Sequence, residues 1–106
     1  MRAEVPEGAF SDLFAVKSAK GLRHFYSHPT GCKMCFDPKE ANEVVPVRVT
    51  LSPTGDFFGW WSAEEKRFSM IYPHRMAVEV CFAYGSAVEE ERGRGRVCQL
   101  AVVELP

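Results

Sequence analysis

A group of histidines and cysteines near residue 30 has the residue types that bind zinc. His24, His28, Cys32 and Cys35 follow the pattern H-x3-H-x3-C-x2-C. Zinc takes four nitrogen or sulfur ligands in a tetrahedron, and the short turn of C-x2-C brings two thiolates to one ion. The spacing therefore permits a small zinc-stabilised module that uses these four side chains.

The short gap between the two pairs is the argument against this site. Zinc motifs of this class place about a dozen residues between the pairs, whereas only three separate His28 from Cys32. The alternative is that these are surface histidines and loop cysteines. A redox role for C-x2-C is not favoured, because Pro38 interrupts any helix that continues from the motif. Cys81 and Cys98 have apolar neighbours and are expected to be small core residues.

A second candidate site is a band of aromatic side chains in the middle of the chain. In an extended strand, Phe57 and Trp61 point to one face, and Phe58 and Trp60 point to the other. One face can form the core. The other needs cover from a helix of this chain, a partner subunit or a ligand, because large exposed apolar patches are unusual. The pattern predicts a binding surface made by Phe58, Trp60, Trp61, Phe68 and Tyr72.

The only basic run is Arg92, Arg94 and Arg96, which alternate with glycines. Arginines spaced in this way can lie along phosphates. However, three glutamates at 89–91 directly precede them, and the formal net charge of the chain is −1. Binding to nucleic acid through bulk charge is therefore not expected.

No motif of a known catalytic class is evident in the sequence. It has no glycine-rich phosphate loop, no G-x-S-x-G and no H-E-x-x-H. We expect a non-enzymatic protein that binds a partner subunit, another protein or a small ligand through its aromatic face, with no catalytic residues and no cofactor. The zinc module with nucleic-acid contact is the alternative, and an unfamiliar small enzyme is the second alternative.

The elements that must position these residues suggest an α+β fold. Alternation of apolar and polar residues predicts strands, and proline, glycine and capping residues mark turns and helix ends. We expect an antiparallel sheet of four to six strands with one or two helices packed on one face. The expected segments are a hairpin over 13–27 (or a helix over 10–20), a short helix from Asp37 to Pro46, a three-stranded meander over 47–72, a helix or strand over 74–84, a helix over 87–92 and a strand over 96–105.

Length and composition limit the class of protein. The chain has 106 residues, of which 46% are hydrophobic and 25% are charged, as expected for a single globular domain. No internal repeat is evident. No apolar stretch approaches the ~20 residues that span a bilayer, and the acidic start, with Glu4 and Glu7, does not resemble a signal peptide. We therefore expect a cytoplasmic protein with reduced cysteines, not bound to a membrane.

Overall fold

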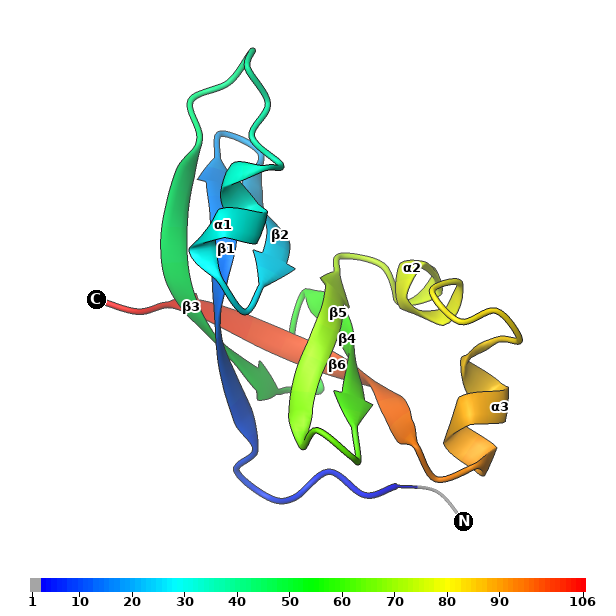
Figure 1. Ribbon diagram of the computed structural model, residues 1–106. Helices are drawn as coiled ribbons and strands as arrows, with labels where there is room; N and C mark the ends of the chain where they lie inside the picture. The colour runs from blue at the N-terminus through cyan, green and yellow to red at the C-terminus, as the bar shows by residue number, and fades with distance from the viewer. Residues whose placement is uncertain (1–2) are drawn as a thin grey trace.

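A computed structural model describes residues 3–106 as one six-stranded antiparallel sheet with three short helices (Figure 1). The antiparallel sheet of four to six strands predicted from the sequence is confirmed. The strands are β1 (Phe10–Ser18), β2 (Gly21–Tyr26), β3 (Glu43–Leu51), β4 (Phe57–Ser62), β5 (Arg67–Tyr72) and β6 (Gly95–Glu104), and the helices are α1 (Pro29–Lys33), α2 (Arg75–Glu79) and α3 (Ser86–Glu91).

The strand order, β2-β1-β3-β6-β4-β5, corrects the expected meander over 47–72. β4 and β5 form the predicted hairpin, but β6 lies between β3 and β4. The turn after β3 crosses β6 and is hydrogen-bonded to it. The backbone N–H of Ser52 donates to the backbone carbonyl of Gln99 over 3.1 Å, and the side-chain amide of Gln99 donates to the backbone carbonyl of Gly55 over 2.8 Å. A side chain at Gly55 would collide with the backbone of Leu100.

The main hydrophobic core lies inside the curl of the sheet. Its largest fully buried side chains include Phe68 and Leu100, and Ile71 and Trp61 pack with them. The Ser11 hydroxyl in β1 accepts a hydrogen bond from the backbone N–H of Phe68 in β5 over 2.9 Å. This bond connects the two sides of the curled sheet, because three other strands separate β1 from β5 in the strand order.

The helices differ from the expected ones in position and length. The segment from Asp37 to Pro46 is not a helix: the Asp37 carboxylate accepts from the backbone of Lys39 over 2.9 Å and so stabilises a turn. Pro46 lies inside β3. A helix forms earlier instead, with Pro29 in its first turn.

The second helix is shorter than predicted, and the third has the predicted length but begins one residue earlier. The helix expected over 74–84 extends only over Arg75–Glu79. The third helix begins after Gly85, its N-cap residue, which has a φ of 85°. Glu90 accepts the backbone N–H of Val97 over 2.9 Å, which connects α3 to β6.

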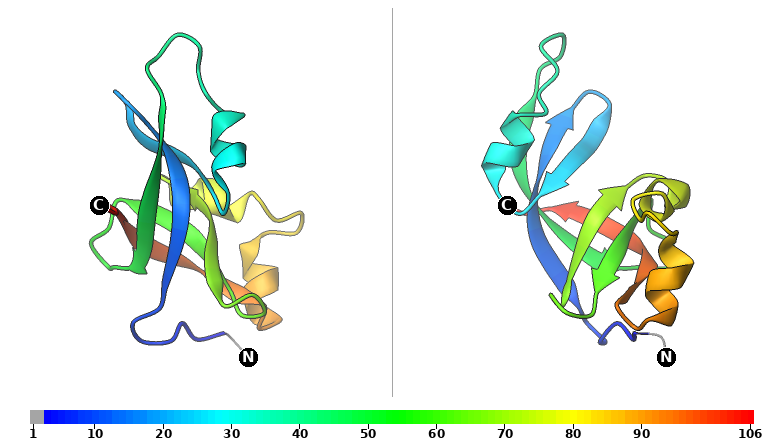
Figure 2. Two further views of the ribbon diagram at one scale, coloured as in Figure 1. Left: turned by 60° about the vertical axis from the view of Figure 1, so that its left-hand side comes forward. Right: turned by 45° about the vertical axis from the view of Figure 1, so that its right-hand side comes forward.

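The strand order reads the same from either edge because the two halves of the chain repeat one fold. β1, β2, α1 and β3 form the first half, and β4, β5, α2 and β6 take the equivalent places in the second. Figure 2 shows α1 and α2 on separate sides of the molecule, each beside the hairpin of its own half. The interpretation of the sequence as free of repeats was therefore wrong.

The strand register shows the same pseudo-two-fold symmetry. Phe14 pairs with Tyr26 in the first hairpin and Phe58 pairs with Tyr72 in the second, and both hairpins shift register at the next step. Between the halves, the pairing of β3 with β6 is symmetric about one pair, Val49 with Val102. The pseudo-two-fold axis passes between these two valines.

The repeat is weak in sequence because most equivalent positions have diverged. Its clearest trace is the motif Y-x-H-x6-C-F, which occurs twice. The first hairpin turn, between Ser18 and Gly21, is also two residues shorter than the second, between Ser62 and Arg67. The equivalent residues of the motif are Tyr26 and Tyr72, His28 and His74, Cys35 and Cys81, and Phe36 and Phe82.

Among residues 3–106, no helix has the length and apolar character needed to cross a membrane.

Candidate functional site

The two edge strands of the sheet, β2 and β5, lie side by side where the curl of the sheet almost closes. Each strand is interrupted at the equivalent position by a residue with a left-handed backbone, His24 with a φ of 57° and Met70 with a φ of 55°. Such residues are uncommon outside glycine and disturb regular strand pairing. The pairing shifts register there within each hairpin, and β2 and β5 themselves remain the two unpaired edges of the sheet.

A cavity of about 430 Å³ lies in the seam between β2 and β5, within the size range of small-molecule sites. Phe25 and Ile71, which belong to the core or pack against it, contribute apolar walls. The polar lining comes from Arg23, His24 and Arg67, together with serine and tyrosine hydroxyls. No aspartate or glutamate lies among the lining residues that the structure describes. We name this cavity the seam cleft.

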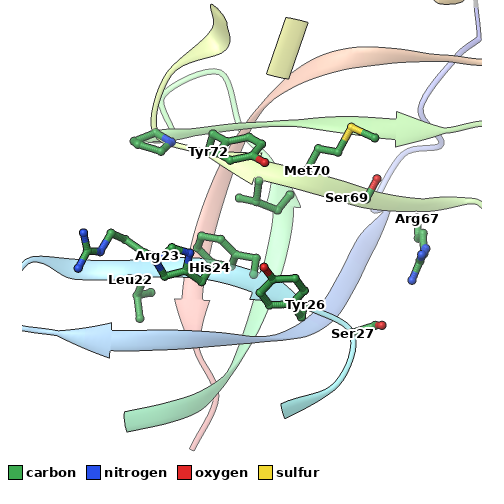
Figure 3. A pocket seen from close by; sticks show the side chains of 12 residues that line it. Leu22, Arg23, His24, Tyr26, Ser27, Arg67, Ser69, Met70 and Tyr72 are labelled. Carbon is green, nitrogen blue, oxygen red and sulfur yellow. The ribbon is translucent and has the colours of Figure 1, made fainter. Parts of the chain in front are cut away.

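Two tyrosines, one from each half of the chain, project into the seam cleft (Figure 3). Tyr26 is 42% exposed and Tyr72 is 39% exposed. The Tyr26 ring packs so closely on Gly31 of α1 that a Cβ at Gly31 would lie 2.7 Å from it. Its hydroxyl oxygen lies 3.3 Å from the sulfur of Cys35.

The second tyrosine has the equivalent partner. Interaction with the Cys81 thiol, which itself donates to the Ala77 carbonyl over 3.1 Å, raises the pKa of the Tyr72 phenol, and partial burial adds to this rise. The bond to Cys35, again followed by burial, raises the pKa of Tyr26. Both phenols are therefore neutral hydrogen-bonding groups at neutral pH.

The arginines of the seam cleft are held by acidic residues outside its lining. Arg23 pairs with Glu40 at 3.1 Å, and Lys20 pairs with the same carboxylate at 3.2 Å. Arg67 pairs with Glu65 at 3.2 Å. The Nε atom of Arg23 is buried and has no hydrogen-bond partner in the part of the chain that the structure describes.

Most of the predicted aromatic surface lies in the interior. Trp61 and Phe68 belong to the main core. Trp60 packs on the other side of β4 against Val78 of α2, with Phe58 and Phe82 beside it. The helix cover considered from the sequence is thus present over Trp60. Of the predicted binding residues, only Tyr72 lines the seam cleft.

The four candidate zinc ligands do not form a cluster in the structure. In residues 3–106, no group of three or more histidine, cysteine or acidic side chains is placed to hold a metal ion. The Cys32 thiol is fully buried and donates to the His24 carbonyl over 3.3 Å. It is the one buried residue of α1, as Val78 is of α2, so packing accounts for it. The zinc site stays a prediction that this geometry does not favour.

The arginine run lies beside its own acidic residues. Arg92 and Arg94 both pair with Glu89, at 3.6 and 3.3 Å, as the arginines of the seam cleft pair with Glu40 and Glu65, so pairing alone does not distinguish the two regions. A second hollow, of about 530 Å³, is lined by Glu4, Arg96 and their neighbours and has no aromatic lining residue. Neither feature combines aromatic and cationic groups as the seam cleft does.

Comparison with known proteins found no match to the chain among protein-family models, curated proteins or solved structures.

Sequence reasoning missed Tyr26, Arg23 and Arg67 as site residues. The signal that could have found Tyr26 is the repeated Y-x-H-x6-C-F motif, which marks Tyr26 as the equivalent of Tyr72. No comparable signal marks the two arginines, because the chain brings them to one cleft only through the curl of the sheet.

Proposed function

We propose that the protein is a non-enzymatic binding protein and that its site for a small ligand is the seam cleft. The observation that carries this proposal is the open seam itself, since two edge strands lie side by side and a cavity of about 430 Å³ separates their side chains. Edge strands that remain unpaired are normally covered or blocked. Here bulky aromatic and cationic groups border the gap.

The lining indicates the class of ligand. Tyr26 and Tyr72 offer aromatic faces and hydroxyl donors, and Arg23 and Arg67 supply guanidinium groups whose paired glutamates lie outside the lining. A partly aromatic anion satisfies both features, because arginine binds carboxylates well and tyrosine packs against flat rings. A cytoplasmic location belongs to the same proposal and is supported by the four free cysteines.

The test is a titration of the isotope-labelled protein with 2-naphthoate, followed by NMR, with the neutral 2-naphthamide in parallel. We expect 2-naphthoate to shift backbone signals of β2 and β5 and to bind more tightly than the amide. Tyr72→Ala should weaken binding by about tenfold, the loss of one good contact. Tyr84→Ala is the matched control, because Tyr84 is 80% exposed and does not line the cleft.

The contribution of positive charge to binding is tested by a matched pair of arginine variants. Arg67→Gln should weaken the acid and leave the amide unchanged, whereas Arg75→Gln, which alters an exposed arginine paired with Glu79, should affect neither. Signals that shift elsewhere, or acid and amide that bind alike in every variant, would refute the proposed site.

A further inference from the structure

The residues that both halves share include three polar pairs at or next to the seam cleft, namely Tyr26 and Tyr72, His28 and His74, and Cys35 and Cys81. Several buried or partly buried equivalents have changed within the apolar class, as with Cys32 and Val78 or Phe25 and Ile71. Cores tolerate such exchanges because they require only volume and apolar character. Packing does not explain why the half-exposed tyrosines at 26 and 72 are identical, nor why each has a cysteine partner. A shared binding role for the tyrosines explains both observations.

The two strands place one tyrosine and one arginine at each end of the seam cleft. Five antiparallel pairings separate β2 from β5 in the sheet order, so the two strands run in opposite directions. The start of each strand therefore lies beside the end of the other. Arg23 near the start of β2 is on the side of Tyr72, and Arg67 at the start of β5 is on the side of Tyr26 (Figure 3).

The hydroxyls at both ends are available to a better acceptor. Sulfur is a weak hydrogen-bond partner. The contacts with Cys35 and Cys81 therefore orient the phenols, and a ligand can replace these contacts with little loss of free energy. A carboxylate accepts a stronger, charge-assisted bond from the same hydroxyl. Each end of the cleft thus offers one phenol donor and one guanidinium.

We propose that the ligand of the seam cleft is an elongated molecule with a flat apolar middle and an anionic group at each end. This inference rests on the proposed function and specifies a ligand with two anionic groups, where the proposed function requires only one. Each anionic end meets a tyrosine from one half of the chain and an arginine from the other. The middle lies along Phe25 and Ile71.

The experiment compares 2,6-naphthalenedicarboxylate, which has two anionic ends, with 2-naphthoate, which has one. Dissociation constants are measured by NMR titration for the unaltered protein, Tyr26→Phe, Tyr72→Phe and the control Tyr84→Phe. We expect the dicarboxylate to bind at least about tenfold more tightly than the monocarboxylate. All three variants remove only a hydroxyl from a tyrosine that the solvent reaches, so each is expected to fold.

The response of the two ligands to the variants is the decisive result. The dicarboxylate should lose about tenfold in affinity with Tyr26→Phe and with Tyr72→Phe, one charge-assisted bond in each case. The monocarboxylate can turn to use the other end, so each change should cost it only about twofold. Tyr84→Phe should change neither ligand.

The inference and the proposed function fail differently. If the dicarboxylate binds no more tightly than the monocarboxylate, or is insensitive to one of the two tyrosines, the two-ended ligand is refuted while the cleft remains a binding site. If neither acid shifts signals of β2 and β5, both are refuted.

Discussion

The Tyr26 hydroxyl lies 3.3 Å from the Cys35 sulfur, and the equivalent pair in the second half of the chain is Tyr72 and Cys81, whose interaction raises the pKa of the Tyr72 phenol. Each pair joins the last residue of an edge strand to a residue just beyond the following helix. The pairs therefore connect α1 and α2 to the two sides of the seam cleft. The orientation of each phenol therefore depends on the position of the helix in its own half of the chain.

The interaction of Tyr72 with Cys81 should be measurable as a shifted tyrosine titration. Because it raises the pKa of Tyr72 above the ordinary value of 10, Cys81→Ala should lower that pKa towards 10. The unfolded chain ionises first, so the contribution to stability is present below pH 10 and is lost as pH rises through the folded pKa. NMR of ring-labelled tyrosine follows each phenol. An unchanged Tyr72 titration in Cys81→Ala would contradict this interaction.

The four cysteines should divide into two classes of reactivity. Burial raises the pKa of Cys98 to about 11 and also raises that of Cys32, and both side chains are closed to solvent. Cys81 is exposed and Cys35 is partly exposed. Since the thiolate is the reactive form, iodoacetamide at pH 8 should label Cys81 and Cys35 first. Peptide mass spectrometry checks this, with guanidinium-unfolded protein as control. Equal labelling of all four in the folded protein would contradict the arrangement.

Metal content and subunit number can be measured together. Cys32 is buried in the core and its thiol donates to the His24 carbonyl, so it is not free to bind a metal ion. We therefore expect the midpoint of thermal unfolding to be unchanged by a chelator. Cys35→Ser should likewise leave it within a few degrees. Native mass spectrometry of protein purified without chelator reads out both bound zinc and the predicted association of chains. One zinc per chain, with a midpoint that falls on chelation, would restore the H-x3-H-x3-C-x2-C site.

The strands were predictable and the sheet order was not, for one physical reason. Alternation at Val47, Val49 and Leu51 is a local property of the chain, and so is the turn between β4 and β5. The pairing of Val49 with Val102 joins residues half a chain apart, and no local pattern specifies it. The helix expected after Asp37 failed because its last residues, up to Pro46, pair with β1 instead; tertiary pairing outweighed a capping signal.

The candidate site was only partly predictable for a related reason. Aromatic residues at 60, 61 and 68 are numerous enough to suggest a surface, but the curl of the sheet and the cover of α2 bury them. The seam cleft forms between strands at opposite edges of the sheet, so its lining residues can be identified only once the curl of the sheet is known. Tyr72 was identified for its aromatic character, whereas Tyr26 requires recognition of the repeat.

The hydrogen bond from the Phe68 backbone to Ser11 should contribute measurably to closing the sheet. Ser11→Ala leaves a buried N–H of β5 without its partner, which costs about 1–3 kcal/mol in free energy of unfolding. Ser18→Ala is the matched control, because the Ser18 hydroxyl accepts only an exposed turn N–H, that of Lys20, and should cost less than about 0.5 kcal/mol. Urea denaturation of both variants gives the comparison. Hydrogen exchange of the Phe68 amide then locates the effect, since that amide should lose protection in Ser11→Ala alone. Equal stability of the two variants would mean that apolar packing of Phe68 and Ile71, without this bond, holds β5 beside β2.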